Sequence, residues 1–204
     1  MTLAETLKLA PVVPVLIIED AAQAVPLAKA LVAGGLYALE VTLRTPVALD
    51  CIRRIAGEVE GAVVGAGTIT TAQARQSAAD AGAKFGVSPG LIDGEGVDGA
   101  LPLLPGIATA SELMRGMRAG FTHFKLFPAN VVGGVGALKA FASPFPQATF
   151  CPTGGVDAKN AADYLALPNV ICVGGSWVAP ADVVRAGDWG RITELARAAS
   201  ALGK

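Results

Sequence analysis

A lysine stands within an otherwise apolar stretch of this sequence. Lys125 lies in Phe121–Ala129, where the surrounding residues are typical of a buried strand. Burial removes an ammonium group from water, which disfavours its charge and frees the amine lone pair to attack a carbonyl carbon. In the alternative interpretation, the lysine stem packs in the core and the ammonium reaches solvent at the rim of the fold. The first interpretation predicts a covalent imine, or Schiff base, between Lys125 and a keto substrate.

A second set of polar side chains alternates along Leu39–Thr45. Side chains two positions apart on a strand share one face, so Glu40, Thr42 and Arg44 are expected together. The glutamate can remove and return protons, and the arginine can bind a carboxylate through two hydrogen bonds. The alternative is a structural ion pair between Glu40 and Arg44 that closes the end of the strand.

Small residues follow the next two strand-like runs of the chain. Gly65–Thr68 and Ser88–Gly90 stand where strands are expected to end, so their small side chains predict room for a ligand. Thr68 adds a hydroxyl group there. Corners of a sheet also use glycine for geometric reasons, which is the structural alternative.

Two glycine pairs close the last two strand-like runs, Gly154-Gly155 and Gly174-Gly175, and Ser176 follows the second pair. Glycine lets the backbone approach an anion closely, and backbone N–H groups in such loops bind phosphate. Turn geometry alone explains one pair more easily than both. The two loops are therefore predicted to form a phosphate site.

The sequence offers few ligands for a metal ion. Its single histidine, His123, lies two residues before Lys125 and is expected to be a packed interior ring on the same strand face. No cluster of carboxylates stands at the expected strand ends. We therefore predict neither a Zn²⁺ nor a Mg²⁺ site, and no metal cofactor.

Short apolar runs rich in β-branched residues alternate with alanine-rich segments along the chain. The expected strands are Val12–Ile18, Tyr37–Thr42, Ala62–Ala66, Lys84–Val87, Leu101–Leu104, Thr122–Phe127, Ala148–Pro152 and Val170–Val173. The expected helices include Ala21–Ala33, Pro46–Val59, Thr70–Ala81, Leu91–Ala100, Ala110–Ala119, Gly134–Phe141 and Ala158–Leu165. Residues that could cap these helices are Asp20, Thr45, Thr70, Thr109 and Asp157.

This alternation predicts an α/β fold with a parallel sheet. Its regular repeat favours a single closed (β/α)₈ barrel over an open doubly wound sheet. The barrel is expected to span residues 1–204, with 1–10 as an N-terminal helical segment. Reactive groups of such barrels lie at the C-terminal ends of the strands.

The composition excludes several classes of partner. Apolar residues make up 52% of the chain and charged residues 16%, which suits strands buried on both faces. A net charge of −1 without basic runs argues against nucleic acid. Prolines and glycines interrupt the apolar stretches, so neither a membrane span nor a signal peptide is predicted. The three cysteines are expected to be buried reduced thiols, and the protein to be cytoplasmic.

Together and in this order, the motifs resemble those of the 2-keto-3-deoxy-6-phosphogluconate (KDPG) aldolases, also called KDPG/4-hydroxy-2-oxoglutarate aldolases. The resemblance covers nearly the whole chain. It is carried by Pro11–Val15, Glu40–Thr45, Gly65–Thr68, Ser88–Gly90, Pro105-Gly106, Phe124–Ala129, Pro152–Gly155 and Gly174–Trp177. It implies a homotrimer of (β/α)₈ barrels and metal-free cleavage of KDPG, a keto acid phosphate, into pyruvate and glyceraldehyde 3-phosphate.

The resemblance also implies roles for individual residues. Lys125 matches the Schiff-base lysine and Glu40 the general acid and base, while Arg44 and Thr68 match the groups that hold the pyruvate carboxylate. The remaining matches are Pro89 and Phe127 as walls of the pyruvyl pocket, Thr153 as a contact to the substrate chain, and Gly154, Gly155, Gly174, Gly175 and Ser176 as phosphate contacts. Leu126 stands where phenylalanine is common in the family, and residues 130–132 are a variable stretch, so the resemblance implies the reaction but not the fine specificity.

Three other functions stay open on these residues. A sister aldolase could act on 4-hydroxy-2-oxoglutarate or on the galactonate isomer of KDPG. A phosphosugar epimerase or isomerase could use the same barrel and phosphate loops without an imine. A non-catalytic barrel could sense a phosphorylated ligand, although the presence of both Glu40 and Lys125 argues against it.

Overall fold

The computed structural model describes residues 1–202, so positions 203 and 204 of the predicted domain lie outside the described residues. The strands are β1 Val12–Leu16, β2 Ala38–Thr42, β3 Val63–Gly67, β4 Gly86–Val87, β5 Leu103–Leu104, β6 Gly106–Ile107, β7 His123–Leu126, β8 Thr149–Pro152 and β9 Val173–Gly175. The helices are α1 Leu3–Leu7, the 3₁₀ turn η1 Ala21–Gln23, α2 Ala24–Ala33, α3 Ala48–Glu58, α4 Ala72–Asp80, α5 Ala110–Arg118, α6 Gly134–Ala142, α7 Ala161–Leu165, α8 Ala181–Ala186 and α9 Trp189–Ser200.

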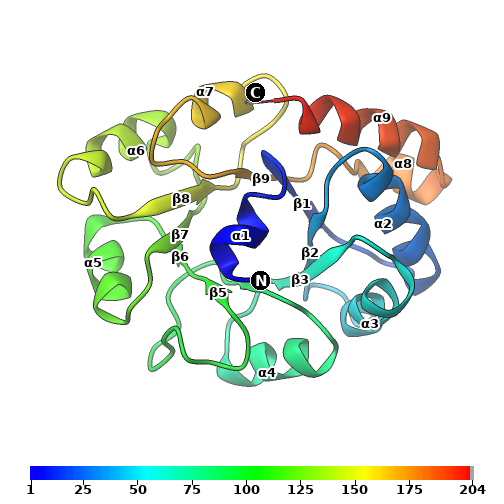
Figure 1. The fold of residues 1–204 in the computed structure, drawn as a ribbon, viewed down its shortest axis with the longest axis horizontal. Helices are drawn as coiled ribbons and strands as arrows, with labels where there is room; N and C mark the ends of the chain where they lie inside the picture. The colour runs from blue at the N-terminus through cyan, green and yellow to red at the C-terminus, as the bar shows by residue number, and fades with distance from the viewer. Residues whose placement is uncertain (203–204) are drawn as a thin grey trace.

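The strands form two parallel sheets. The first has six strands in the order β5-β4-β3-β2-β1-β9, and the second has three in the order β6-β7-β8. β5 and β6 follow each other directly and are separated by Pro105, which has no amide hydrogen to donate. At the other side, single parallel bridges join Phe150 to Val170 and Thr153 to Gly174. Figure 1 shows the helices α2 to α9 surrounding this central group of strands.

Burial explains why the strands are apolar without alternation. Every residue of β1 and β2 is buried, because side chains of one face point into the centre and those of the other face contact helices. The fold is therefore α/β with parallel sheets, as predicted. No helix within residues 1–202 is both long and apolar enough to cross a bilayer.

Most predicted strands are found in shortened form, but β3 keeps its length and is shifted by one residue, and the sequence does not predict β6. The run Val170–Val173 meets β9 only at its last residue, because Phe150 and Asn169 hold the preceding turn and the ladder begins at Val173. The predicted caps Asp20 and Thr109 are confirmed. The caps predicted at Thr45, Thr70 and Asp157 are wrong, because the helices begin later, after Val47, Thr71 and Asn160.

The predicted helix Leu91–Ala100 is wrong. This segment consists of turns, and Gly94 adopts a positive φ of 77° that a helix does not allow. Arg75, only 1% exposed, holds the loop instead. Its guanidinium donates to the carboxylate of Glu95 and to the carbonyl oxygens of Gly96 and Leu101. The loop 91–100 is therefore held in place by hydrogen bonds from a buried side chain of α4, and not by helical backbone hydrogen bonds of its own.

Candidate active site

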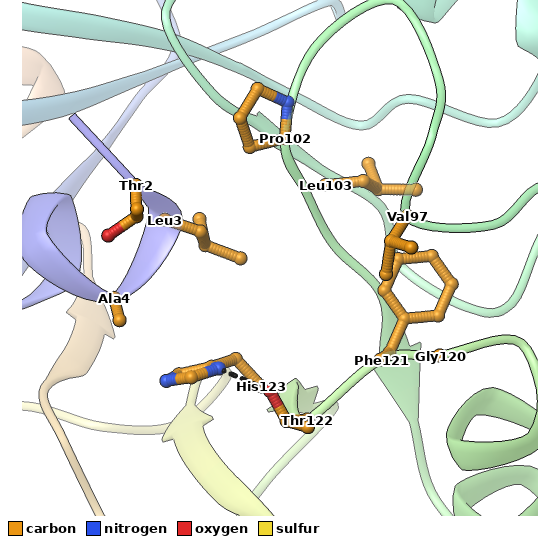
Figure 2. Close-up of a pocket in the computed structure, with 10 residues that line it drawn as sticks. All are labelled: Thr2, Leu3, Ala4, Val97, Pro102, Leu103, Gly120, Phe121, Thr122 and His123. Carbon is orange, nitrogen blue, oxygen red and sulfur yellow. Dashed lines mark hydrogen bonds between the residues drawn. The ribbon is translucent and has the colours of Figure 1, made fainter.

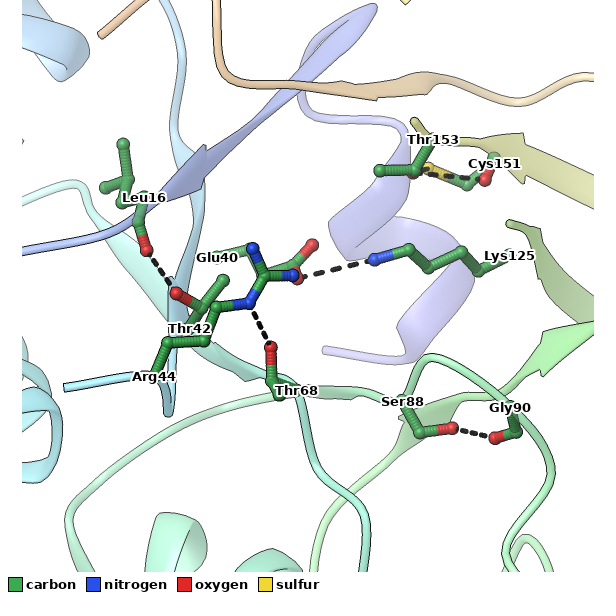
Figure 3. Close-up of polar contacts among 10 residues, drawn as sticks. All are labelled: Leu16, Glu40, Thr42, Arg44, Thr68, Ser88, Gly90, Lys125, Cys151 and Thr153. Carbon is green, nitrogen blue, oxygen red and sulfur yellow. Dashed lines mark hydrogen bonds and ion pairs between the residues drawn. The ribbon is translucent and has the colours of Figure 1, made fainter. Parts of the chain in front are cut away.

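Lys125 and Glu40 form a buried pair at the centre of the molecule. Nζ of Lys125 lies 3.6 Å from Oε1 of Glu40, and the two side chains are 4% and 3% exposed. This separation is longer than a hydrogen bond. Within residues 1–202, Oε1 of Glu40 is the one buried side-chain N or O atom without a hydrogen-bond partner. The amine and the carboxylate therefore form a buried ion pair, in which Oε1 is free to accept a proton from a bound substrate (Figure 3).

The surroundings of Lys125 fix the direction of its side chain. Its backbone N–H donates to the carbonyl oxygen of Pro105, and the residue stands opposite Gly106 and Cys151 in the ladder of β7. Its ammonium lies 5.0 Å from the ring centroid of Phe127, within the range of a cation–π contact. The alternative interpretation, in which the ammonium reaches solvent, is wrong because the side chain is buried.

Arg44 and Thr68 form a second polar contact beside this pair. Nε of Arg44 donates to the hydroxyl of Thr68 over 3.0 Å. Within residues 1–202 Glu40 pairs with Lys125 and not with Arg44, which contradicts the alternative interpretation of a structural Glu40–Arg44 ion pair. Thr68 has a φ of 60°, in the left-handed region that a β-branched residue rarely adopts. Thr42, between Glu40 and Arg44 on β2, donates its hydroxyl to the carbonyl oxygen of Leu16 and is thereby occupied.

A cavity of about 160 Å³ opens next to the Lys125 amine. Most predicted site residues line it, namely Arg44, Lys125, Phe127, Thr153, Gly154, Gly155, Gly174, Gly175 and Ser176. Val15, Ile17 and Val156 also line it, and the sequence alone does not single them out because apolar residues are common in strands. Glu40, Thr68 and Pro89 are not among the lining residues. Glu40 and Thr68 are linked to the cavity through Lys125 and Arg44.

Several glycines near the cavity are required by neighbouring side chains. The space beside Gly65 is filled by the ring of Phe85, and the space beside Gly67 by the carboxylate of Glu40. The prediction that the small residues of Gly65–Thr68 leave room for a ligand is therefore wrong for Gly65 and Gly67, which leave room for protein side chains. A side chain at Gly174 would collide with Thr153, in the same way. The absence of a side chain at these glycines therefore makes space for neighbouring side chains of the core or of the candidate site.

His123 lies away from the cavity, at the opposite end of β7. It lines a separate cavity of about 240 Å³ beside Thr2, Leu3 and Ala4 at the start of α1 (Figure 2). Burial, and secondarily the positive charge of Lys8, lower the pKa of the ring. The ring is only half-buried, so the expected packed interior ring is corrected to a cavity wall.

The thiols are all buried, as predicted, and within residues 1–202 none is paired in a disulfide. Cys172 contacts Cys151, and this contact and burial raise the pKa of its thiol well above the ordinary value. In the same part of the chain, no three His, Cys, Asp or Glu side chains gather as a metal site would require.

Comparison with known proteins gives one consistent result. Residues 3–195 match the family model described as KDPG and KHG aldolase. A 2-dehydro-3-deoxy-phosphogluconate aldolase from Pseudoalteromonas atlantica is 58% identical over 94% of this chain and 90% of that protein. A KHG/KDPG aldolase from Escherichia coli K12 is 55% identical over 93% of this chain and 90% of that protein.

A solved structure agrees with these sequence matches. The KDPG aldolase of Legionella pneumophila, crystallised with pyruvate captured as a covalent carbinolamine, superposes with a TM-score of 0.94. It is 45% identical to this chain, and the match covers 97% of this chain and 98% of that one. On this agreement of sequence, fold and buried lysine, the chain belongs to the KDPG and KHG aldolase family.

Proposed function

We propose that this chain is a class I aldolase that cleaves KDPG to pyruvate and D-glyceraldehyde 3-phosphate through an imine on Lys125. The observation that carries the proposal is the buried Lys125 amine, 3.6 Å from the Glu40 carboxylate and on the wall of a cavity. An uncharged amine attacks a ketone, and a nearby carboxylate can move the protons that the reaction requires. The covalent pyruvate adduct of the Legionella pneumophila relative supports the same chemistry.

The reaction begins when the Lys125 amine attacks the C2 ketone, and loss of water leaves a protonated imine. Glu40, directly or through water, removes the proton from the C4 hydroxyl. The C3–C4 bond breaks, glyceraldehyde 3-phosphate leaves, and the electron pair moves into the imine to give a pyruvate enamine. Glu40 then returns the proton to C3, and water hydrolyses the imine to release pyruvate and restore the amine.

The two anionic ends of the substrate align the reacting bond. We assign the pyruvate carboxylate to Arg44, held in place by its hydrogen bond to the Thr68 hydroxyl. Phe127 and Pro89 would enclose the pyruvyl group, and Thr153 would contact the chain. We assign phosphate binding to the two loops that line the cavity with Gly154, Gly155, Gly174, Gly175 and Ser176. Binding both ends uses affinity to orient the C2 ketone toward the lysine.

The proposed architecture is a single closed (β/α)₈ barrel over the whole chain, with residues 1–10 as an N-terminal helical segment. The short break at Pro105 and the two bridges to Val170 and Gly174 support closure of the two sheets into one ring. In a barrel the C-terminal strand ends share one mouth, which matches the grouping of Lys125, Glu40 and Ser176.

The remaining parts of the proposal follow from the family. We assign a homotrimer to the protein and an imine chemistry that uses no metal. The three buried thiols suit a reducing compartment, so we assign the protein to the cytoplasm.

A second substrate is favoured by one specific observation. The Escherichia coli relative is named a KHG/KDPG aldolase, so 4-hydroxy-2-oxoglutarate is a candidate alongside KDPG. This substrate ends in a carboxylate at C5, whereas KDPG continues through a C5 hydroxyl to a phosphate ester on C6. Measuring kcat/KM on each of the two substrates ranks them directly.

Reductive trapping tests the central step. The protein is incubated with pyruvate and borohydride, digested, and analysed by mass spectrometry. We expect a stable adduct on Lys125. An unmodified Lys125 in a protein that nonetheless turns over a phosphosugar would favour an epimerase. An adduct on another lysine would show that the imine forms there and not on Lys125.

A further inference from the structure

We infer that Gly67 is a positioning residue, which directs the Glu40 carboxylate toward Lys125 by leaving empty the volume of its own side chain. A Cβ atom placed on Gly67 would lie 2.7 Å from both Cγ and Cδ of Glu40, and closer still to Oε1. The three nearest atoms all belong to Glu40. The glutamate therefore reaches the lysine by passing directly over Gly67, and this inference rests on the proposed function only for its catalytic consequence.

The backbone around Gly67 has little freedom to move away. β2 and β3 are paired in register along their whole length, with Glu40 opposite Gly65 and Thr42 opposite Gly67. The carbonyl oxygen of Gly67 accepts a 2.9 Å hydrogen bond from the N–H of Leu43. A side chain at position 67 must therefore displace the glutamate, because the ladder holds the strand.

The glutamate also has no space on its inner side. The position of a Cβ on Gly65, one layer deeper on the same face of β3, is filled by the Phe85 ring. Phe85 itself is fully buried. The Phe85 ring already fills the volume on this side of Gly67, so a Glu40 displaced by a side chain at position 67 must leave its present 3.6 Å distance to Lys125.

Glycine at position 67 is not required by the backbone conformation. Its φ lies outside the positive region, in contrast to Thr68, the next residue. An alanine would therefore fit the strand itself, and its cost would come from contact with Glu40. This makes the inference testable by removing the glutamate.

The first test measures stability and is independent of catalysis. Gly67→Ala is made in the natural chain and in the Glu40→Ala background, and thermal midpoints are compared. We expect a loss of roughly 3–10 °C in the natural chain and little or no loss in the Glu40→Ala background, where the volume is free. If Gly67→Ala folds only when combined with Glu40→Ala, the inference is supported equally, whereas equal losses in both backgrounds would overturn it.

The second test measures positioning through kinetics. A misplacement of about 1 Å costs on the order of 10²-fold in rate, so Gly67→Ala should lower kcat by about that factor. KM should change little, because Arg44 and Thr68 keep their contact. In the Glu40→Ala background, whose side chain ends at Cβ and leaves the contested volume free, the same substitution should lower the remaining kcat by less than about threefold. A full loss in that background would overturn the inference.

Controls separate this inference from the proposed function. Gly57→Ala adds a methyl group to an exposed glycine of α3 with nothing within 4 Å. It is expected to leave kcat unchanged and not to lower the melting midpoint, because alanine favours a helix more than glycine does. If the natural chain forms no Lys125 adduct with pyruvate and borohydride, the aldolase proposal fails while the stability comparison still decides the packing of Gly67.

Discussion

Lys125 and Glu40 face each other across 3.6 Å although their strands, β7 and β2, belong to different sheets. No ladder of backbone hydrogen bonds connects these two strands directly. The separation of amine and carboxylate therefore depends on the side chains that pack around them, and single substitutions there should change chemistry before they change the fold.

Removal of the lysine amine should abolish turnover. We expect Lys125→Ala to lower kcat by at least about 10³-fold, because Lys125 is the lysine among the residues that line the cavity. Circular dichroism should show the natural secondary structure. Lys139→Ala, at an exposed position of α6, is the matched control and should retain full activity. Normal turnover by the Lys125→Ala protein would contradict the Schiff-base assignment.

Neutralising the carboxylate should separate proton transfer from imine formation. Glu40→Gln keeps the shape of the side chain and should lower kcat by about 10²- to 10⁴-fold. The variant should still give the Lys125 adduct when pyruvate and borohydride are present for long enough, because the nucleophile remains. Single-turnover kinetics measures both steps. An unchanged rate of C3–C4 cleavage would show that Glu40 is not the group that transfers the proton.

Ser176 should matter for phosphorylated substrates alone. Its side chain is exposed at the cavity wall, and a hydrogen bond to a charged phosphate contributes about 1.5–3 kcal/mol. Ser176→Ala should therefore raise KM for KDPG by roughly 10- to 100-fold. Cleavage of 4-hydroxy-2-oxoglutarate should be nearly unaffected, so an equal loss on both substrates would argue for a structural role.

Arg75 should contribute to stability without contributing to catalysis. Its replacement in Arg75→Met leaves the carbonyl oxygen of Leu101 and the Glu95 carboxylate without their partner, and the side chains of Arg75 and Glu95 are only 1% and 19% exposed. Breaking such a buried pair costs about 3–5 kcal/mol. Urea unfolding should show this loss, and limited proteolysis should cut within 91–100. If the loop 91–100 of Arg75→Met stays resistant to protease, Arg75 is not the residue that holds this loop in place.

His123 should make the protein less stable in weak acid. Burial and the charge of Lys8 lower the pKa of the folded ring, so the unfolded chain binds a proton more readily. Full stability is present above the unfolded pKa of about 6.5 and is lost as the pH falls toward the lower folded value. In His123→Gln, the free energy of unfolding measured with urea should depend less on pH between about pH 8 and 5.5. An unchanged slope would exclude the histidine as its origin.

The sequence predicts the parts of the site that break a local pattern. Lys125 and Glu40 stand out because each places a charge inside an apolar strand, and these two side chains do meet. Arg75 does not stand out, because its partners lie at least twenty positions away and an arginine in a helix is usually exposed. The regular repeat of the chain predicts a helix over Leu91–Ala100, and three glycines and a long-range anchor override that repeat.

The roles of glycine could not be read from spacing. Gly67 and Gly174 occur in motifs that suggest ligand loops, yet their missing side chains are explained by Glu40 and Thr153. Such packing depends on neighbouring strands, and the sequence shows only the order of these strands. The positive φ of Thr68 is likewise set by the fold, since threonine does not favour it.

The backbone of Thr68 links stability to the pyruvate binding proposed for Arg44 and Thr68. A residue held in the left-handed region costs the folded state about 1–3 kcal/mol, and glycine would avoid most of that cost. Glycine would also remove the hydroxyl that receives the Arg44 hydrogen bond. Heat selection of random variants would therefore tend to enrich replacements at this position that bind pyruvate poorly, so a thermostable aldolase made from this chain should keep Thr68 fixed.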